Sequence, residues 1–310
     1  MVRTGVRRLI LLLALTACRG DSEAMPDATP DAKGSYPPPR SDVFMRLGSP
    51  DTLDLAAWNI ENFPAGGITP SRVADLITSL DLDIIMVEEI ASETAWAELI
   101  ARLPEHEGIL SEHRYTPTEY QKLGIIYRKS MVTPSAIGLL FQSNTYEFPR
   151  PPLTAVLTVD DGVHRALSFR VIGVHLKAGI AQEDGDRRRL ALQDLDGRIR
   201  ATIADGTEDE YLIAGDYNEV LATTIGQTNM APFLTAPDLY TIHTQAASDR
   251  GEITFVPANV MLDHITTTAA LADDILGWQL VIPRLQTLPA YTSEVSDHLP
   301  VVLIAPLQPR

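Results

Sequence analysis

The stretch Ser296-Asp297-His298-Leu299-Pro300, close to the C-terminus, is the most informative part of the sequence and stands directly before an apolar run that begins at Val301. An earlier stretch, Gly215-Asp216-Tyr217-Asn218, has similar chemistry and directly follows the apolar run 211–214. Both stretches place acidic, amide or imidazole side chains where predicted strands meet loops. Polar groups gathered at strand ends are what a metal-assisted phosphate site requires, so the two stretches together predict one such site.

Other predicted strands also end in polar side chains, although they lie far apart in the sequence. Each residue has an ordinary explanation when taken singly: Asn59 is of a type common at turns, and a histidine such as His175 often closes an apolar strand for structural reasons. Their joint occurrence at strand ends is not expected by chance, and it favours one shared site. The polar set consists of Asn59, Glu89, His175, Asp216, Asn218, Asp263, Asp297 and His298.

Apolar periodicity along the chain predicts many strands and few helices. The helix expected over 69–80 begins at Thr69-Pro70, where threonine suits the N-cap and proline the first helical position. Further helices are expected over 96–103 and 183–203. This composition favours an α/β fold of two packed sheets with helices outside, and we expect each half of the domain to supply one sheet. The predicted strands are 53–58, 83–87, 123–127, 153–159, 167–175, 211–214, 253–256, 261–266, 279–282 and 301–304.

The N-terminal residues form a predicted targeting segment. Three arginines within the first eight residues make a basic region, and Leu9–Leu15 is an apolar run too short to span a bilayer. The following Leu15-Thr16-Ala17-Cys18 resembles the lipobox of bacterial lipoproteins, in which the signal is cut before the cysteine and the cysteine is lipidated. We therefore expect a signal peptide over 1–17 and an exported protein anchored through Cys18 to the bacterial cell envelope, at the outer membrane or cell surface.

The remainder is expected to contain a tether and one domain. Residues 18–50 hold six prolines among Asp, Ser, Gly and Ala, which predicts a disordered Pro-rich tether. Residues 51–310 are long enough for one large α/β domain. Cys18 is the only cysteine, so no disulfide can form within one chain and the domain must be stabilised by its core.

The charge and the missing motifs exclude several function classes. The chain has 25 Lys and Arg against 41 Asp and Glu, a formal net charge of −16, whereas a high-affinity non-specific nucleic-acid binder normally has the opposite sign. A long polyanion or an anionic membrane should be attracted weakly unless divalent cations intervene. The sequence has no Gly-x-Ser-x-Gly elbow, which argues against a serine hydrolase, and no His-x-x-x-His or cysteine cluster, which argues against a zinc hydrolase. It also has no Gly-rich loop, which argues against a nucleotide-binding fold.

Five motifs resemble, in the same order, the endonuclease/exonuclease/phosphatase superfamily of metal-dependent phosphoesterases. The resemblance implies a four-layer α/β sandwich, with two packed, mostly antiparallel sheets flanked by helices and the site at one end of the sheets. The superfamily includes deoxyribonucleases, abasic-site endonucleases, inositol polyphosphate 5-phosphatases and sphingomyelinases, so the motifs do not choose a substrate. They are Trp58-Asn59-Ile60-Glu61-Asn62-Phe63, Asp83-Ile84-Ile85-Met86-Val87-Glu88-Glu89, Val174-His175-Leu176-Lys177, Gly215-Asp216-Tyr217-Asn218 and Ser296-Asp297-His298-Leu299-Pro300.

The resemblance also implies a metal site. Glu89 is expected to be the principal Mg²⁺ ligand, with help from Asn59 and, through a water, from Asp297. Mn²⁺ and Ca²⁺ are the alternative ions. Carboxylate and amide oxygens suit Mg²⁺, which keeps several of its waters in proteins.

The remaining members of the polar set are expected to act on the phosphate. Asp216 would orient or deprotonate the attacking water, and Asn218 would hold that water or a phosphate oxygen. His298 would bind the phosphoryl oxygens while Asp263 fixes its tautomer, and His175 would be the second phosphate-binding histidine. A carboxylate behind a histidine raises its basicity and favours the protonated form.

Three positions depart from the superfamily pattern or extend it. Glu88 stands where Gln is common, and its charge either tightens the metal site or faces solvent. Gln121 stands where deoxyribonuclease-like members carry a Glu behind the first histidine, so His175 is expected to be less basic, and Gln121 remains a candidate substrate contact. Arg187 could contact substrate phosphate at the start of a helix, although a solvated helix face is the more common use of such a residue.

The sequence therefore predicts an Mg²⁺-dependent phosphoesterase that hydrolyses phosphodiester bonds, with nucleic acid the preferred substrate class over lipid. A phospholipid, inositol phosphate or small-phosphoester hydrolase is the first alternative, because the acidic charge disfavours long polyanions. Sphingomyelinase-like members expose apolar loop residues for membrane contact, and no aromatic hairpin of that kind is evident here. An inactive binding lipoprotein is the second alternative. We expect a monomer that reaches the membrane through lipidated Cys18.

Overall fold

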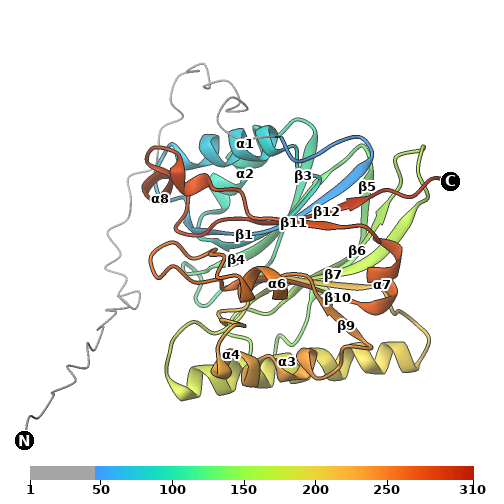
Figure 1. Cartoon of the computed structure of the whole chain (residues 1–310). Coiled ribbons are helices and arrows are strands. Elements are labelled where there is room, and N and C mark those ends of the chain that lie inside the picture. The colour runs from blue at the N-terminus through green and yellow to red at the C-terminus, as the bar shows by residue number, and fades with distance from the viewer. Residues whose placement is uncertain (1–45) are drawn as a thin grey trace, which may run out of the picture. The chain divides into compact units, whose positions relative to one another are not determined.

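Two six-stranded sheets pack against each other in the computed structural model, which describes residues 46–310 (Figure 1). The predicted signal peptide, Cys18 and the tether as far as residue 45 lie outside the described residues. The first sheet has the order β11-β12-β1-β2-β4-β3, and only β1 and β2 are parallel neighbours in it. Its strands are β1 (Thr52–Phe63), β2 (Ile84–Ile90), β3 (His106–Leu110), β4 (Lys122–Arg128), β11 (Gln279–Val281) and β12 (Val301–Pro306).

The second sheet has the order β5-β6-β7-β8-β10-β9, and only β7 and β8 are parallel neighbours in it. Its strands are β5 (Val132–Leu139), β6 (Leu153–Val159), β7 (Leu167–His175), β8 (Tyr211–Asp216), β9 (Tyr240–Ile242) and β10 (Asp263–Thr268). The prediction of two packed, mostly antiparallel sheets is confirmed.

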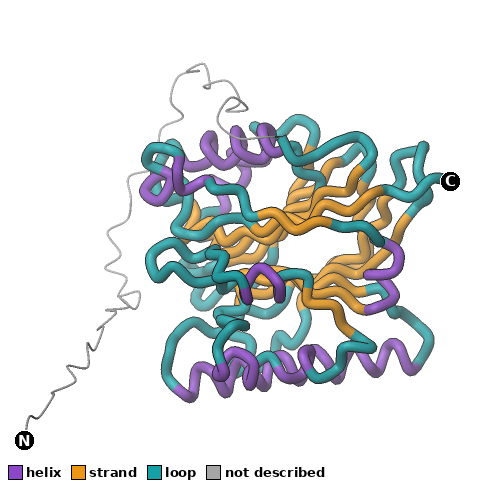
Figure 2. Tube along the Cα trace, viewed as in Figure 1, coloured by secondary structure: helices purple, strands orange, loops and turns teal. Residues whose placement is uncertain are grey.

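Helices cover the outer face of each sheet (Figure 2). α1 (Thr69–Leu80) and α2 (Glu93–Ala101) pack on the first sheet, and α3 (Gln182–Ala204) packs on the second. These four layers give the predicted α/β sandwich. No helix within residues 46–310 has the length and apolar character needed to cross a membrane. The short helices are α4 (Thr224–Asn229), α5 (Ala231–Leu234), α6 (Gln245–Asp249), α7 (Ala269–Asp274), α8 (Tyr291–Glu294) and the 3-10 turn η1 (Leu285–Thr287).

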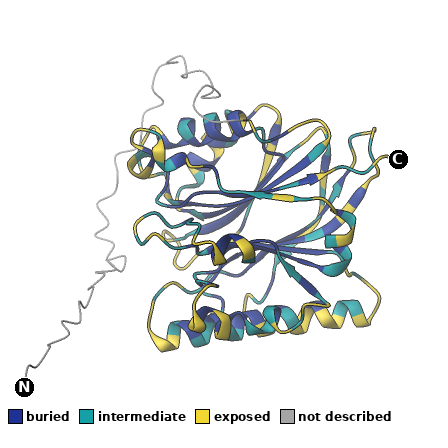
Figure 3. Cartoon of the chain, viewed as in Figure 1, coloured by how far each residue is buried: buried dark blue, intermediate teal, exposed yellow. Residues whose placement is uncertain are grey.

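The strands of both sheets are mostly buried (Figure 3). Alternation of side chains along each strand separates the core between the sheets from the cores beneath the helices. On β1, the buried Leu53, Leu55 and Ala57 face the second sheet, whereas Ala56 and Trp58 face α1 and α2. Each buried leucine of this kind contributes about 2 kcal/mol through its removal from water. Because side chains alternate along a strand, the residues that continue the row of Leu53, Leu55 and Ala57 also face the second sheet.

Several details of the predicted architecture are wrong. The segment 253–256 is not a strand and makes only isolated bridges, from Phe255 to Val260 and to His298. The two halves of the domain do not each supply one sheet, because β11 and β12 return to the first sheet beside β1. Strands β3, β5 and β9 were not predicted.

The start of α1 and the residues before β1 also differ from expectation. The N-cap of α1 is Ile68 rather than Thr69, and the Thr69 hydroxyl instead accepts a hydrogen bond from the Gly66 amide at 3.0 Å. The amides of Leu47 and Gly48 both donate to the Leu80 carbonyl at 3.1 Å. These contacts attach residues before position 51 to the end of α1.

Candidate active site

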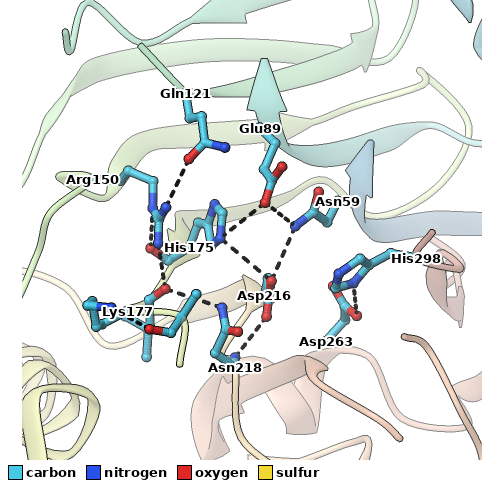
Figure 4. Close-up of polar contacts among 12 residues, drawn as sticks. Asn59, Glu89, Gln121, Arg150, His175, Lys177, Asp216, Asn218, Asp263 and His298 are labelled. Carbon is cyan, nitrogen blue, oxygen red and sulfur yellow. Dashed lines mark hydrogen bonds and ion pairs between the residues drawn. The ribbon is translucent and has the colours of Figure 1, made fainter. Parts of the chain in front are cut away.

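One end of the sandwich collects the polar set. The parallel pairs β1–β2 and β7–β8 all finish at this end, and the antiparallel neighbours β10 and β12 begin there. In the second sheet, Asp216 is paired with His175 on one side and with Asp263 on the other. The structure thus brings together residues that are far apart in the sequence (Figure 4).

Most of these side chains continue the rows that form the core between the sheets. Asn59 follows the inward row of β1, and His175, Asp216 and Asp263 occupy the corresponding inward positions of β7, β8 and β10. All four are buried. The apolar core therefore ends in a polar layer that lies between the two sheets.

Glu89 reaches the same layer only because the backbone is irregular. Alternation along β2 would turn it toward α1 and α2, but its φ is +64° and the pairing of β2 with β4 shifts register between Val87 and Ile90. A second register shift interrupts the β1–β2 pairing at Glu61 and Asn62, whose φ angles are +40° and +42°. Left-handed residues other than glycine cost about 1 kcal/mol each and cluster at functional sites.

Two carboxylate oxygens converge at the centre of the polar layer. The Asn59 amide nitrogen donates to Oε1 of Glu89 and to Oδ2 of Asp216, each at 3.2 Å. Nε2 of His175 lies 3.6 Å from the same two oxygens. Asn59 was expected to offer an oxygen to a metal, whereas here its nitrogen lies between the two acids and its Oδ1 accepts from the Glu61 amide at 3.0 Å.

Asp216 is held by the loop that follows it. Its Oδ1 accepts a hydrogen bond from the Asn218 amide at 2.8 Å, and Asn218 has a left-handed φ of +53°. The Asn218 side chain donates to the Leu176 carbonyl at 3.3 Å, which ties this loop to the end of β7. Burial, with the nearby Asp263 charge, raises the pKa of Asp216 to about 7. A carboxylate of that pKa is suited to accept a proton near neutral pH.

His298 forms a buried ion pair with Asp263. Nδ1 of His298 lies 2.8 Å from Oδ2 of Asp263, and the histidine is 5% exposed. Burial alone would lower the pKa of His298, but Asp263, Asp216 and Asp297 together raise it to about 10. The Ser296 hydroxyl donates to the Asn59 carbonyl at 2.7 Å and accepts from the His298 amide at 2.9 Å. His298 is therefore a fixed, charged group that faces the polar layer.

His175 has a different electrostatic environment. Its Nδ1 is buried without a hydrogen-bond partner, and burial, with Arg150 and His298 nearby, holds the pKa of His175 well below its usual value. Gln121 makes no recorded contact with His175. Its Oε1 instead accepts from Nη1 of Arg150 at 3.1 Å, and Arg150 donates to the carbonyls of His175 and Leu176. The expected weak basicity of His175 agrees with this arrangement.

Glu88 neither faces solvent nor joins the other carboxylates in a hydrogen bond. It is fully buried, both of its carboxylate oxygens lack partners, and burial beside Asp263 and Asp216 raises its pKa well above the usual value. It packs over Gly215, where a Cβ would lie 2.0 Å from the Val174 carbonyl and 2.8 Å from Oε1 of Glu88. Gly215 has a φ of +140°, so glycine is required there by conformation as well as by space.

Of the remaining predicted residues, Asp297 lies in the site and Arg187 does not. Asp297 belongs to the site: its Oδ1 is 3.9 Å from Nε2 of His298, and its amide donates to Oε2 of Glu61 at 3.0 Å. Arg187 instead donates to the Tyr146 carbonyl at 2.6 Å and stacks over the Tyr146 ring, and it has no recorded contact with the polar set.

Glu61, Asn62 and Arg150 take part in the site but were not predicted. Glu61 and Asn62 stand inside the first motif, whereas Arg150 has no sequence signal.

The donor chemistry fits a hard divalent cation. Glu89 and Asp216 point oxygen atoms at one shared point, and no Lys or Arg among residues 46–310 is recorded in contact with either carboxylate. Burial, and after it the charge of neighbouring carboxylates, raises the pKa of Glu61, Asp216 and Asp297, so a bound cation would offset repulsion among these acids. Asp216 and Asp263 also place oxygens within 4.8 Å of each other and of a His298 nitrogen, although Asp263 already occupies Nδ1 of that histidine.

Comparison with solved structures identifies the fold. No family model and no curated protein matches the sequence. Among solved structures, TDP2 from D. rerio, crystallised with a single-strand DNA product, has a TM-score of 0.61 at 14% identity and covers 82% of this chain and 98% of its own. Truncated TDP2 from Caenorhabditis elegans has a TM-score of 0.60 at 14% identity, with coverage of 82% and 98%. An endonuclease/exonuclease/phosphatase protein from Bacteroides vulgatus has a TM-score of 0.59 at 16% identity, with coverage of 83% and 99%. The chain therefore has the α/β sandwich fold of these proteins.

Proposed function

We propose that this protein is a divalent-metal-dependent phosphodiesterase. The observation that carries the proposal is the convergence of Glu89 and Asp216 beside a positively charged His298. Phosphodiester hydrolysis needs an activated water and positively charged groups beside the phosphoryl oxygens, whose negative charge they stabilise. The polar layer offers a carboxylate base and a cationic histidine within one small region.

Glu89 and Asp297 would hold the metal, and Asn59 would join them if its amide turned its oxygen inward. The bound ion would supply Lewis-acid stabilisation of charge on the phosphate. Mg²⁺ is the ion proposed first, with Mn²⁺ or Ca²⁺ as substitutes, because all the available donors are oxygens.

The proton chemistry would be carried out by Asp216 and Asn218, at the end of β8, together with the two histidines. Asp216 accepts a proton from the attacking water, whose oxygen forms the new bond to phosphorus as the bond to the leaving oxygen breaks. Asn218 positions this water, and the leaving oxygen gains its proton from solvent. His298, kept protonated by Asp263, donates hydrogen bonds to the phosphoryl oxygens as their charge grows. His175, held neutral by its surroundings, supplies a further hydrogen-bond donor.

Nucleic acid is the proposed substrate class. The support comes from the fold, since a neighbour of this fold was crystallised with a single-strand DNA product. The net charge of −16 favours the second candidate, a small phosphoester or a phospholipid headgroup, because a long polyanion would be repelled. We further propose a monomer that is exported and attached to the cell envelope through lipidated Cys18.

A cleavage assay tests the proposal. Purified protein would be incubated with plasmid DNA, single-stranded DNA and RNA, and in parallel with phosphocholine lipids and inositol phosphates, with Mg²⁺ or with EDTA. We expect Mg²⁺-dependent cleavage of at least one nucleic acid, lost in Asp216→Asn and retained in Asp54→Asn, a buried strand acid at the other end of β1. Cleavage of only the small esters would choose the second candidate, and a folded protein without any activity would reject both.

A further inference from the structure

We infer that Gln121 and Arg150 are positioning residues that join the two halves of the site across the gap between the sheets. We call this pair the brace. Gln121 stands just before β4 in the first sheet, and Arg150 stands just before β6 in the second. Nη1 of Arg150 donates to Oε1 of Gln121 at 3.1 Å (Figure 4). The effect of the brace on the catalytic rate rests on the proposed function, whereas the coupling of the two sheets through the brace does not.

On the first sheet, the brace leads to Glu89. Nε2 of Gln121 donates to Oδ1 of Asn62 at 2.6 Å, and the Asn62 amide donates to Oε2 of Glu89 at 2.9 Å. Asn62 and Glu89 both have left-handed φ angles, so each needs support from its surroundings to stay in place. Gln121 holds the side chain of Asn62, and Asn62 in turn holds the carboxylate of Glu89.

On the second sheet, the brace leads to Asn218 and Asp216. Nη2 of Arg150 donates to the Leu176 carbonyl at 2.8 Å, and Nε donates to the His175 carbonyl at 3.1 Å. The Leu176 carbonyl also accepts from the Asn218 side chain, and the Leu176 amide donates to the Asp216 carbonyl at 2.9 Å. Arg150 therefore fixes the loop that carries the water-positioning residues.

The brace matters because no backbone ladder connects the two sheets. Backbone hydrogen bonds between the two sheets are confined to segments outside the strands, such as the Leu299 amide to the Thr254 carbonyl. Side-chain contacts therefore help to set the relative position of Glu89 and Asp216, and displacement by about 1 Å can cost a catalytic site a hundredfold in rate. A second direct link, from Asn59 to both carboxylates, uses the Glu89 oxygen that would engage the metal and the Asp216 oxygen that would accept the proton. Gln121 and Arg150 make no recorded contact with either carboxylate, so they can hold the geometry throughout the reaction.

Amide hydrogen exchange tests the coupling without any reference to activity. The Asn62 and Leu176 amides are the reporters, since each donates to one side of the site. Arg150→Met removes the brace from the second sheet, and we expect exchange at Asn62, on the first sheet, to rise about tenfold. Gln121→Leu should produce the reciprocal rise at Leu176. Unchanged exchange at Asn62 in Arg150→Met would overturn the inference.

A conservative variant separates the two sides of the brace. Gln121→Glu keeps an oxygen for Arg150 but loses the donor to Asn62, so exchange should rise at Asn62 and stay unchanged at Leu176. The matched controls are Arg165→Met and Gln142→Leu, whose side chains bond to Asp274 and to the Leu139 carbonyl. Neither control should change exchange at either reporter.

Kinetics with bis(p-nitrophenyl) phosphate tests the positioning role. We expect Arg150→Met and Gln121→Leu each to lower kcat about tenfold with KM unchanged, and the double variant to be no slower than the worse single one. Additive losses, or full rate in both single variants, would overturn the role. If the unmutated protein cleaves no phosphodiester, the proposed function fails, and the exchange measurement still decides whether the brace couples the sheets.

Discussion

Strands β1 and β2 run side by side, and acidic residues stand at both ends of this pair. At the end opposite the site, the Asp54 amide donates to the Asp83 carboxylate at 3.0 Å. Asp83 and Asp81 both pair with Arg128, at 2.6 and 2.8 Å. Arg46 adds a second guanidinium to Asp81. A permanently charged arginine with several donors thus pairs with Asp81 and Asp83 at this end, while Oδ1 of Asp54 has no hydrogen-bond partner.

The acids at the site end have less positive charge beside them. Glu89 and Asp216 share a neutral amide and a histidine whose pKa is lowered, while the charged His298 is engaged by Asp263. Both ends bury acids on the same strands, so burial alone does not mark a functional site. The difference lies in whether the protein itself supplies the compensating cation, and at the site end that role is left to a bound metal and a phosphate-binding histidine.

The largest predicted effect comes from removing one charge at the site end. Asp216→Asn should lower turnover about a thousandfold at saturating Mg²⁺, because the proposed base is lost while the side-chain shape is kept. Steady-state kinetics and circular dichroism would measure rate and folding together. Asp54→Asn, the matched change at the opposite end, should keep the rate within about twofold. Equal losses in the two variants would remove the distinction between the ends.

The second-largest predicted effect concerns His298, the positively charged side chain of the site. Asp263→Asn should lower the rate about a hundredfold, because His298 would lose the nearest charge that raises its pKa. The pH at which NMR shows His298 to titrate should fall from about 10 toward its ordinary value. A variant that kept both the rate and the raised pKa would show that Asp263 does not act through His298.

At the opposite end, the predicted effect is on stability. Arg128→Met should lower the free energy of unfolding by about 2 kcal/mol, since Asp81 and Asp83 would be left close together without their shared cation. Urea unfolding would measure this loss, and activity should remain unchanged in native buffer. A fall in activity without a fall in stability would contradict the structural role assigned to this cluster.

The last predicted effect is a pH dependence of stability at Asp54. Burial, then the Asp83 charge, raises the pKa of Asp54 from 3.8 to about 7. Between these values the folded state keeps a proton that the unfolded state has lost, so this residue destabilises the fold increasingly as pH rises, by at most about 1.4 kcal/mol per pH unit. Below pH 3.8 and above pH 7 its contribution levels off. The stability of Asp54→Asn relative to the unmutated protein should therefore increase from pH 4 to pH 7, and a constant difference would refute the shift.

Much of the site could be predicted from alternation along the strands. Asn59, Asp216 and Asp263 continue inward rows whose apolar members are evident in the sequence. Glu89 does not continue an inward row, because its own left-handed backbone conformation turns its side chain inward, and the apolar pattern of the sequence does not reveal that conformation. Arg150 lies in a loop and acts through backbone carbonyls, which leave no pattern in the sequence either.

The strands that were missed share one property. β3, β5 and β9 all lie at sheet edges, and much of β3 and β5 is exposed. Edge strands bury only part of their surface, so they lack the apolar runs that predict central strands. The segment 253–256 has apolar residues but joins no sheet. The Leu299 amide donates to the Thr254 carbonyl, and the Val256 amide donates to the Asp297 carbonyl, so the segment lies beside the residues that precede β12.

The most direct test of the account is thermal unfolding with and without Mg²⁺ in three proteins: the unmutated chain, Glu89→Gln and Asp54→Asn. A metal that binds the folded state at a hundred times its Kd adds about 2.7 kcal/mol of stability. The account predicts that Mg²⁺ raises the midpoint of the unmutated protein and of Asp54→Asn, and that Glu89→Gln loses this rise. No rise in the unmutated protein, or an equal rise in Glu89→Gln, would contradict a cation site at the end of β1 and β2.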